Sequence, residues 1–333
     1  MNSFGRLFRV TIFGESHGES VGINIDGVPA GLPLALEDFL PDLERRKGGI
    51  QKGTTPRKED DLPIFRSGLF NQTTTGAPIS ILFENNNTRS ADYEKQRAVP
   101  RPGHADFVAH KKFGGFEDYR GGGAFSAWLT VGLVAAGVIA KKLMGAAISI
   151  TADILEVGGE KDQEKGLQRA IDAKDSIGGI VECRVSGLPV GLGEPFFDSV
   201  ESLLAHAAFA IPAVRGVEFG TGFAAARLFG SQHNDAIEDM TGRTRTNHAG
   251  GVVGGITNGN ELVYRIAIKP TSSTPREQMT LNWETEQQEK FSVKGRHDLC
   301  VALRAPVILE AVTAIVLADL LMLEQLIARI WPG

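Results

Sequence analysis

The sequence has few cysteines and no excess of positive charge, and each shortage argues against a class of protein. Its two cysteines, Cys183 and Cys300, have no CxxC or Cys/His spacing around them, which argues against a structural metal and for a reducing compartment. Lys and Arg number 35 against 40 Asp and Glu, so there is no overall positive field for nucleic acid or an anionic membrane. The 333 residues are 42% hydrophobic and 23% charged, which is typical of a soluble globular protein. Any anion must therefore be bound by a local cluster.

The longest uncharged stretch, residues 124–140, ends at Lys141 and Lys142 and superficially resembles a membrane span. It is shorter than the roughly 20 residues that a span needs, it is rich in small residues, and it follows three glycines. We expect it to be a helix buried in a large core. The N-terminal residues lack the apolar stretch of a signal peptide, so we expect a cytoplasmic protein with no membrane partner.

Hydrophobic periodicity predicts a mixed α+β fold. Strands are expected at 7–13, 21–26, 78–84, 147–153, 179–185 and 261–268, and helices at 36–47, 125–144, 163–174, 198–209 and 306–330.

Two segments repeat in the same order in each half of the chain. Residues 26–33 (DGVPAGLP) parallel 186–193 (SGLPVGLG), each after an apolar strand and before a helix. Gly68, Thr74 and Gly76 then align with Gly251, Thr257 and Gly259. We expect one domain built of two similar halves, about 1–145 and 146–333, whose sheets sandwich the two apolar helices. Coincidence of common turn residues is the alternative.

The turn at 14–18 (GESHG) matches the G-x-S-x-G elbow of serine hydrolases. An elbow needs a helix after the serine, whereas the residues after Ser16 alternate like a strand, so we discount a hydrolase. The glycines are better suited to hold His17 beside a cavity, where an imidazole can donate or accept a proton. A purely structural histidine is the alternative.

Three further segments combine polar groups with glycine or an element end. They are 101–106 (RPGHAD) with the triple glycine 121–123, 269–273 (KPTSS), and 295–298 (GRHD). Glycines before a helix admit a ligand close to the backbone, although tight packing explains them equally well. Lysine and hydroxyls suit a phosphate. A basic set, Arg45, Arg46, Lys47, Lys52, Arg57 and Lys58, suggests a polyanionic small molecule, with a solvated face as the alternative.

Taken together, these segments resemble the chorismate synthase family from Phe8 to about Leu320. The matching blocks are Phe13-Gly-Glu-Ser-His-Gly18, Thr54-Thr-Pro-Arg-Lys58, Arg101-Pro-Gly-His-Ala-Asp106, Asp118-Tyr-Arg-Gly-Gly-Gly123, Ser231-Gln232, Asn247-His-Ala-Gly-Gly251, Lys269-Pro-Thr-Ser-Ser273 and Gly295-Arg-His-Asp298.

The resemblance implies a β-α-β sandwich assembled into homotetramers. It also implies a lyase of the shikimate pathway that eliminates phosphate and a ring hydrogen from 5-enolpyruvylshikimate 3-phosphate to give chorismate. Reduced FMN is required in that family without net redox change, because the cofactor carries the hard chemistry. NADPH is a further expected reductant, with an external flavin reductase as the other source of reduced flavin.

The same resemblance assigns roles to residues of this chain. His17 would protonate the leaving phosphate, His104 would stabilise the reduced flavin, and Asp298 would accept a proton from it. FMN would be held by Ala124, Phe125, Ser126, Pro212, Ala213, Gly254, Lys269, Pro270, Thr271, Ser272, Ser273 and Arg296. Arg45, Arg46, Lys52 and Arg57 would bind the substrate's anionic groups or NADPH, and no metal is expected.

The chain departs from the family at Ala124 and Trp128, where relatives often carry a cation. Losing a charge-assisted contact costs about 1.5–3 kcal/mol. A vacant phosphate subsite at Trp128, stacking of its indole on the flavin, or a flavin-binding relative with weakened turnover would each explain the change. If the subsite is vacant, Trp128→Arg should raise substrate affinity.

Overall fold

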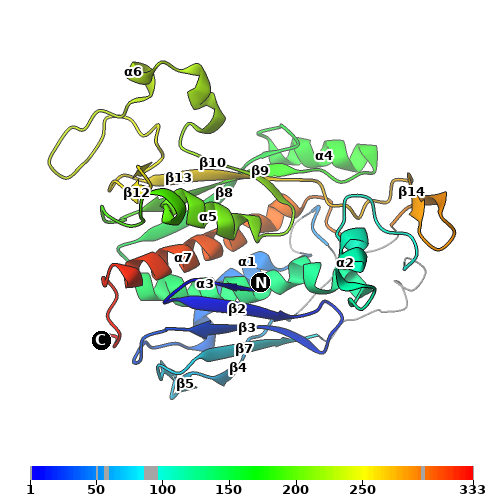
Figure 1. The fold of residues 1–333 in the computed structure, drawn as a ribbon, viewed down its shortest axis with the longest axis horizontal. Helices are drawn as coiled ribbons and strands as arrows, with labels where there is room; N and C mark the ends of the chain where they lie inside the picture. The colour runs from blue at the N-terminus through cyan, green and yellow to red at the C-terminus, as the bar shows by residue number, and fades with distance from the viewer. Residues whose placement is uncertain (1, 50–51, 56–59, 86–96, 294–296, 333) are drawn as a thin grey trace.

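The computed structural model describes residues 2–49, 52–55, 60–85, 97–293 and 297–332. In Figure 1 two sheets lie on either side of a layer of helices, with the sheet from the first part of the chain in blue and cyan. The mixed helix and strand content confirms the predicted α+β class.

The first sheet is antiparallel and has the strand order β1-β2-β3-β7-β4. Alternation along β7 buries Ile79, Ile81 and Phe83 on one face, and Ile81 lies opposite Ile23 of β3. These strands are β1 (Ser3–Phe4), β2 (Arg9–Gly14), β3 (Ser20–Asp26), β7 (Ile79–Glu84) and β4 (Ile64–Ser67), and the short pair β5 (Leu69–Phe70) and β6 (Thr73–Thr74) follows β4 in the chain.

The second sheet is also antiparallel, with the order β10-β13-β9-β8. Tyr264 of β13 lies opposite Cys183 of β9, and its hydroxyl is 2.6 Å from Oγ1 of Thr313 in the helix layer. The strands are β8 (Ser149–Val157), β9 (Gly179–Ser186), β10 (Val214–Phe219) and β13 (Leu262–Ile268), with two separate ladders formed by β11 (Val252–Val253) and β12 (Ile256–Thr257) and by β14 (Gln278–Asn282) and β15 (Gln287–Phe291).

Two apolar helices, α3 (Thr130–Met144) and α7 (Ala305–Leu323), pack against each other between the sheets (Figure 1). A Cβ on Gly137 would lie 2.4 Å from the Cβ of Ala311, so the helices approach as closely as glycine allows. The other helices are α1 (Leu40–Arg46), α2 (Asp106–Phe113), α4 (Gln163–Ala173), α5 (Val200–Phe209) and α6 (Gly230–His233), with 3₁₀ turns η1 (Leu36–Asp38), η4 (Arg120–Phe125), η5 (Ala127–Leu129), η6 (Phe196–Asp198), η7 (Gly222–Arg227) and η8 (Val301–Arg304).

Both central segments are long and apolar enough to pass for membrane spans. They cover Ala127–Met144 and Val301–Leu323, and 78% and 83% of these windows are buried inside the protein. Small residues such as Gly137 allow this close packing, so burial in the protein core accounts for their apolar character.

Each predicted strand and helix has a counterpart in the structure, and the differences lie mainly at the ends. The last helix ends at Leu323 rather than near 330. The predicted helix 125–144 begins as the separate turns η4 and η5, because Gly121, Gly122 and Gly123 adopt positive φ just before it. The predicted elements do not include strands β1, β4 and β10, the short strands β5, β6, β11, β12, β14 and β15, or helices α2 and α6.

The two repeated segments make the same contacts. Thr74 Oγ1 donates to the Pro29 carbonyl at 2.6 Å and accepts from Leu32 N at 2.9 Å. Thr257 Oγ1 lies 2.7 Å from the Pro189 carbonyl and 2.9 Å from Leu192 N. Four strands of the first sheet lie in the order β2-β3-β7-β4, and the second sheet has the order β8-β9-β13-β10. In both orders the first two strands along the chain are followed by the fourth and then by the third.

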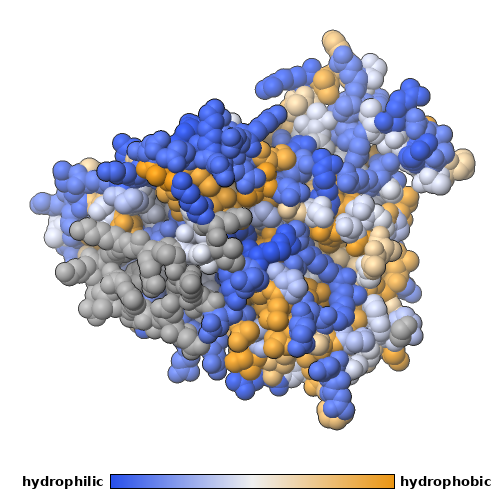
Figure 2. Space-filling model, turned by 180° about the vertical axis from the view of Figure 1, so that it is seen from behind, coloured by the Kyte–Doolittle hydropathy of each residue, from blue (hydrophilic) through white to orange (hydrophobic). Residues whose placement is uncertain are grey.

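An excursion between β10 and β11, which carries α6, projects from the body at the upper left of Figure 1. The opposite view in Figure 2 shows apolar patches set among hydrophilic residues. Large exposed side chains on the excursion include Phe223, Phe229 and Met240.

Candidate active site

A cavity of about 690 Å³ lies where both central helices begin, with Thr130 of α3 and Arg304 just before α7 in its wall. Its volume is in the range of small-molecule and cofactor sites. Helix N-termini expose N–H groups and a partial positive charge, so this end of the helix layer favours anions.

The structure brings most of the predicted site residues to this cavity. Those in its wall are His17, Arg46, His104, Ala124, Phe125, Ser126, Pro212, Ala213, Lys269, Thr271, Ser272, Ser273 and Asp298. Arg45, Lys52, Gly254 and Pro270 are not among the lining residues. Arg57 and Arg296 lie outside the described residues, so their roles stay predictions.

His17 sits in a turn that a neighbouring strand end holds in place. Asn85, which follows β7, donates from Nδ2 to the carbonyls of Ser16 (2.7 Å) and Gly18 (3.0 Å). The backbone N–H of Ser16 donates to the Gly123 carbonyl at 3.1 Å. His17 is thereby fixed, largely buried, beside the triple glycine.

The triple glycine allows two histidines to approach the same stretch of backbone. Gly121 has φ +61°, and a Cβ there would lie 2.5 Å from Cδ2 of His17. A Cβ on Gly122 would lie 3.3 Å from Cε1 of His104. Close approach of a ligand and tight packing both explain these glycines in the sequence. In the structure, Gly121 and Gly122 pack closely against the two imidazoles.

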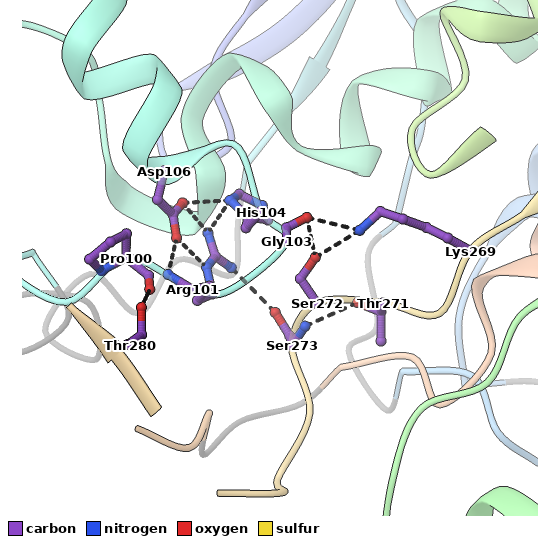
Figure 3. Close-up of polar contacts among 10 residues, drawn as sticks. All are labelled: Pro100, Arg101, Gly103, His104, Asp106, Lys269, Thr271, Ser272, Ser273 and Thr280. Carbon is purple, nitrogen blue, oxygen red and sulfur yellow. Dashed lines mark hydrogen bonds and ion pairs between the residues drawn. The ribbon is translucent and has the colours of Figure 1, made fainter. Parts of the chain in front are cut away.

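His104 belongs to a hydrogen-bonded cluster with Arg101 and Asp106 (Figure 3). His104 Nδ1 lies 2.5 Å from Oδ1 of Asp106, and Arg101 donates to both oxygens of the same carboxylate at 2.8 Å. Burial alone would raise the pKa of Asp106, but the hydrogen bonds from Arg101 and His104 outweigh it and lower the pKa. Asp106 is therefore ionised at neutral pH.

The 269–273 loop is tied to the His104 segment. Lys269 Nζ and Ser272 Oγ both donate to the Gly103 carbonyl, at 2.9 and 2.8 Å, and Arg101 Nη1 lies 3.3 Å from Ser273 Oγ (Figure 3). Burial, followed by the charge of Arg215, lowers the pKa of Lys269. One ammonium and several hydroxyls thus stand together at the cavity wall, as phosphate binding requires.

Asp298 is held from two sides. Its Oδ1 accepts from Thr55 N at 2.9 Å, and its Oδ2 pairs with Arg304 Nη2 at 2.5 Å. The adjacent His297 has its pKa lowered by burial and by the charge of Arg101, so it is neutral at pH 7. Asp298 is thereby a fixed carboxylate beside a neutral imidazole.

Arg46 and Trp128 share Asp61 in the cavity wall. Arg46 Nη1 donates to Oδ2 of Asp61 at 2.8 Å, and the Trp128 indole N–H donates to Oδ1 at 3.0 Å. Arg46 Nη2 also donates to the Trp128 carbonyl at 2.8 Å. Trp128 is only 7% exposed. The position is therefore filled by a hydrogen-bonded core side chain, which contradicts the hypothesis of a vacant subsite there.

The side chains of Arg45 and Lys52 contact other groups of the protein and do not line the cavity. Arg45 donates to both oxygens of Glu310 at 2.9 and 2.6 Å, and Lys52 Nζ lies 3.4 Å from Oε1 of Gln168. The predicted basic cluster is thus divided between the cavity and the protein's own acidic groups.

Among the described residues, positive groups outnumber negative ones around the cavity. Its lining contains Arg46, Lys47, Arg101, Lys269 and Arg304 against Asp61 and Asp298, together with His17, His104, His206 and His297. Apolar side chains such as Phe125, Leu133 and Ile315 form another part of the wall. A ligand with a flat apolar body and several anionic groups fits this division.

A family model for chorismate synthase matches residues 8–322. The chain belongs to the chorismate synthase family. It is 71% identical to a chorismate synthase of Chitinophaga pinensis over the full length of both chains. A chorismate synthase of Dehalococcoides mccartyi is 46% identical, with 99% of each chain covered. A crystal structure of chorismate synthase superposes with a TM-score of 0.73 at 28% identity, covering 98% of this chain and 95% of the other.

Membership of the chorismate synthase family confirms the predicted lyase of the shikimate pathway. It disfavours both the hydrolase and the flavin-binding relative without turnover. The structure agrees on the first point, because Ser16 is followed by strand β3 rather than by the helix that an elbow needs.

Sequence reasoning did not place Thr55, Asp61 or Arg304 in the site. Arg304 stands six residues after Asp298 and directly before an apolar helix, which is the one signal that could have found it. Thr55 acts through its backbone N–H, and Asp61 lies among other acids, so neither stands out in the sequence.

Proposed function

We propose that this cavity is the active site in which 5-enolpyruvylshikimate 3-phosphate loses phosphate and a ring hydrogen by 1,4-anti elimination to give chorismate. The observation that carries the proposal is the meeting of His17, His104 and Asp298 in one cationic cavity. These residues come from three distant parts of the chain, and their convergence supports a shared chemical task.

The substrate carries a phosphate and two carboxylates, which the cationic lining would bind. Arg46 is the member of the predicted basic set that lies in the wall, and Lys47, Arg101 and Arg304 join it there. The contacts of Arg45 with Glu310 and of Lys52 with Gln168 do not support their predicted contact with substrate or NADPH.

His17 would act as the general acid on the leaving phosphate. Such proton transfer contributes typically about 10²–10⁴-fold to a rate. Asp298, held by Thr55 and Arg304, would act as the fixed base. His104, whose Nδ1 is bound to Asp106, would direct Nε2 to the cofactor.

The residues present fit FMN, because hydroxyls and an ammonium stand beside an apolar wall. Lys269, Thr271, Ser272 and Ser273 would hold its phosphate, and Ala124, Phe125, Ser126, Pro212 and Ala213 would contact the ring and chain. Gly254, Pro270 and Arg296 remain proposed FMN residues from the resemblance alone. Bound by these residues, reduced FMN would supply electron density for the departure of phosphate, with no net redox change.

NADPH or an external flavin reductase would supply the reduced flavin. We further propose a cytoplasmic homotetramer with two similar halves, about 1–145 and 146–333, sandwiching the central helices. Exposed Phe196 and Phe197, at 87% and 92%, support self-association, since exposed apolar surface marks interaction sites.

Anaerobic release of inorganic phosphate from the substrate tests the function. We expect release with chemically reduced FMN, none with oxidised FMN alone, and release with oxidised FMN plus NADPH only if the protein reduces its own flavin. His17→Ala should slow release about 10²-fold or more. Tight flavin binding with no phosphate release under any condition would overturn the proposal in favour of a binding protein.

A further inference from the structure

The His104 imidazole is held by a carboxylate that is itself saturated with hydrogen bonds. Oδ1 of Asp106 lies 2.5 Å from His104 Nδ1 and accepts from Arg101 Nη2 at 2.8 Å. Oδ2 accepts from Arg101 Nε at 2.8 Å and from Arg101 N at 3.0 Å (Figure 3). Three N–H groups of Arg101 therefore fix Asp106, and Asp106 in turn fixes the ring.

The geometry determines which ring nitrogen carries the proton. An ionised carboxylate can only accept, so a contact of 2.5 Å requires a proton on Nδ1 of His104. Arg101 Nη2 is 3.1 Å from the same nitrogen and cannot donate to it once Nδ1 bears hydrogen. Arg101 Nη2 donates instead to Oδ1 of Asp106. Nε2 is left as the nitrogen that exchanges a proton with a ligand.

We propose that Asp106 is the positioning residue of His104 and holds its imidazole in the Nδ1–H tautomer with Nε2 directed to the cavity. This rests on the proposed role of His104 in the reaction. Gly122 is part of the arrangement, because a Cβ there would lie 3.4 Å from Nε2. Asp106 does not itself touch the substrate or cofactor in this scheme.

Asp106→Asn tests the proposal, because it keeps the shape and removes the charge. We expect kcat to fall about 10- to 100-fold, with KM for the substrate within about threefold. Glu117→Gln is the matched control, since Glu117 pairs with His110 Nδ1 at 3.1 Å outside the main cavity. It should leave kcat unchanged.

Proton NMR gives a second measurement, which does not depend on turnover. We expect a strongly downfield imidazole N–H signal in the wild type, assigned by its loss in His104→Gln and shifted upfield in Asp106→Asn. Absence of the signal in the wild type, or an Asp106→Asn protein with unchanged kcat, would overturn the proposal. If His104→Gln retains full turnover, the role of His104 in catalysis fails, while the signal still decides whether Asp106 positions the ring.

Discussion

The indole nitrogen of Trp128 lies 3.0 Å from Oδ1 of Asp61, and both side chains are buried in the cavity wall. The other oxygen of Asp61 accepts from Arg46 at 2.8 Å. Each oxygen of the Asp61 carboxylate thus has a donor, one from Trp128 and one from Arg46. Asp61 has a positive φ of 47°, so these contacts also hold a strained backbone in place.

Trp128→Phe should weaken both stability and substrate binding. The change keeps most of the ring but removes the N–H that donates to a buried carboxylate, a loss of about 1.5–3 kcal/mol. Asp61 is then no longer held in place beside Arg46. We expect KM for the phosphorylated substrate to rise about tenfold, equal to 1.4 kcal/mol. Thermal unfolding and steady-state kinetics measure the two effects.

Trp331→Phe is the control for that experiment. Trp331 is bonded through its backbone N–H to Ala30 near the C-terminus, and it is not among the cavity-lining residues. Its replacement should leave KM unchanged. If Trp128→Phe also leaves KM unchanged, the Asp61 link does not orient Arg46 for substrate.

Gly121→Ala should abolish most activity. Its Cβ would stand 2.5 Å from Cδ2 of His17 and 2.7 Å from Oγ of Ser16, and the residue has φ +61°. Gly114 has a similar φ of +65°, but the nearest atom to its Cβ would be at 3.7 Å. Gly114→Ala should therefore cost only about 1 kcal/mol of stability, with activity retained. Equal activities of the two variants would show that the position of His17 does not depend on the absence of a side chain at residue 121.

Glu310→Gln should destabilise the fold by about 1.5–3 kcal/mol, because a buried carboxylate loses its charge-assisted hydrogen bonds to two partly exposed cations. Glu310 accepts from Arg45, from Lys141 at 2.8 Å and from Ala152 N at 3.1 Å. Chemical denaturation measures the loss.

Arg45→Gln separates a structural from a substrate-binding role for the same ion pair. Its side chain is 47% exposed, so the stability cost should be about 1 kcal/mol or less. Substrate KM should stay within about twofold of the wild type, a change below about 0.4 kcal/mol. A tenfold rise in KM would restore Arg45 to the substrate site.

Cys183 should resist alkylation in the folded protein. Burial raises its pKa from 9.0 to about 12, and Thr313 offsets this only in part. Because the folded pKa is higher than the unfolded one, the stabilisation is complete below about pH 9 and is lost as pH rises toward 12. Iodoacetamide at pH 8.5 should label this thiol only after denaturant is added; rapid labelling of the native protein would contradict its burial.

The sequence by itself determined the main strands and helices and the site residues that stand in local motifs. Alternation predicted most long strands, because a half-buried strand must alternate, and glycines next to a histidine marked His17 and His104. All of the block 269–273 except Pro270 lines the cavity, because residues that are neighbours in a loop lie close together in space.

Only the tertiary structure decided where individual cations point and what fills position 128. Arg45 and Arg46 are adjacent on α1, and successive helical residues face different directions, so one meets Glu310 and the other meets Asp61 in the cavity wall. Asp61 is separated from Trp128 by 67 residues, and no local pattern links them. Such partners are set by how the central helices pack between the sheets, and that packing follows from the burial of the whole chain rather than from any one segment.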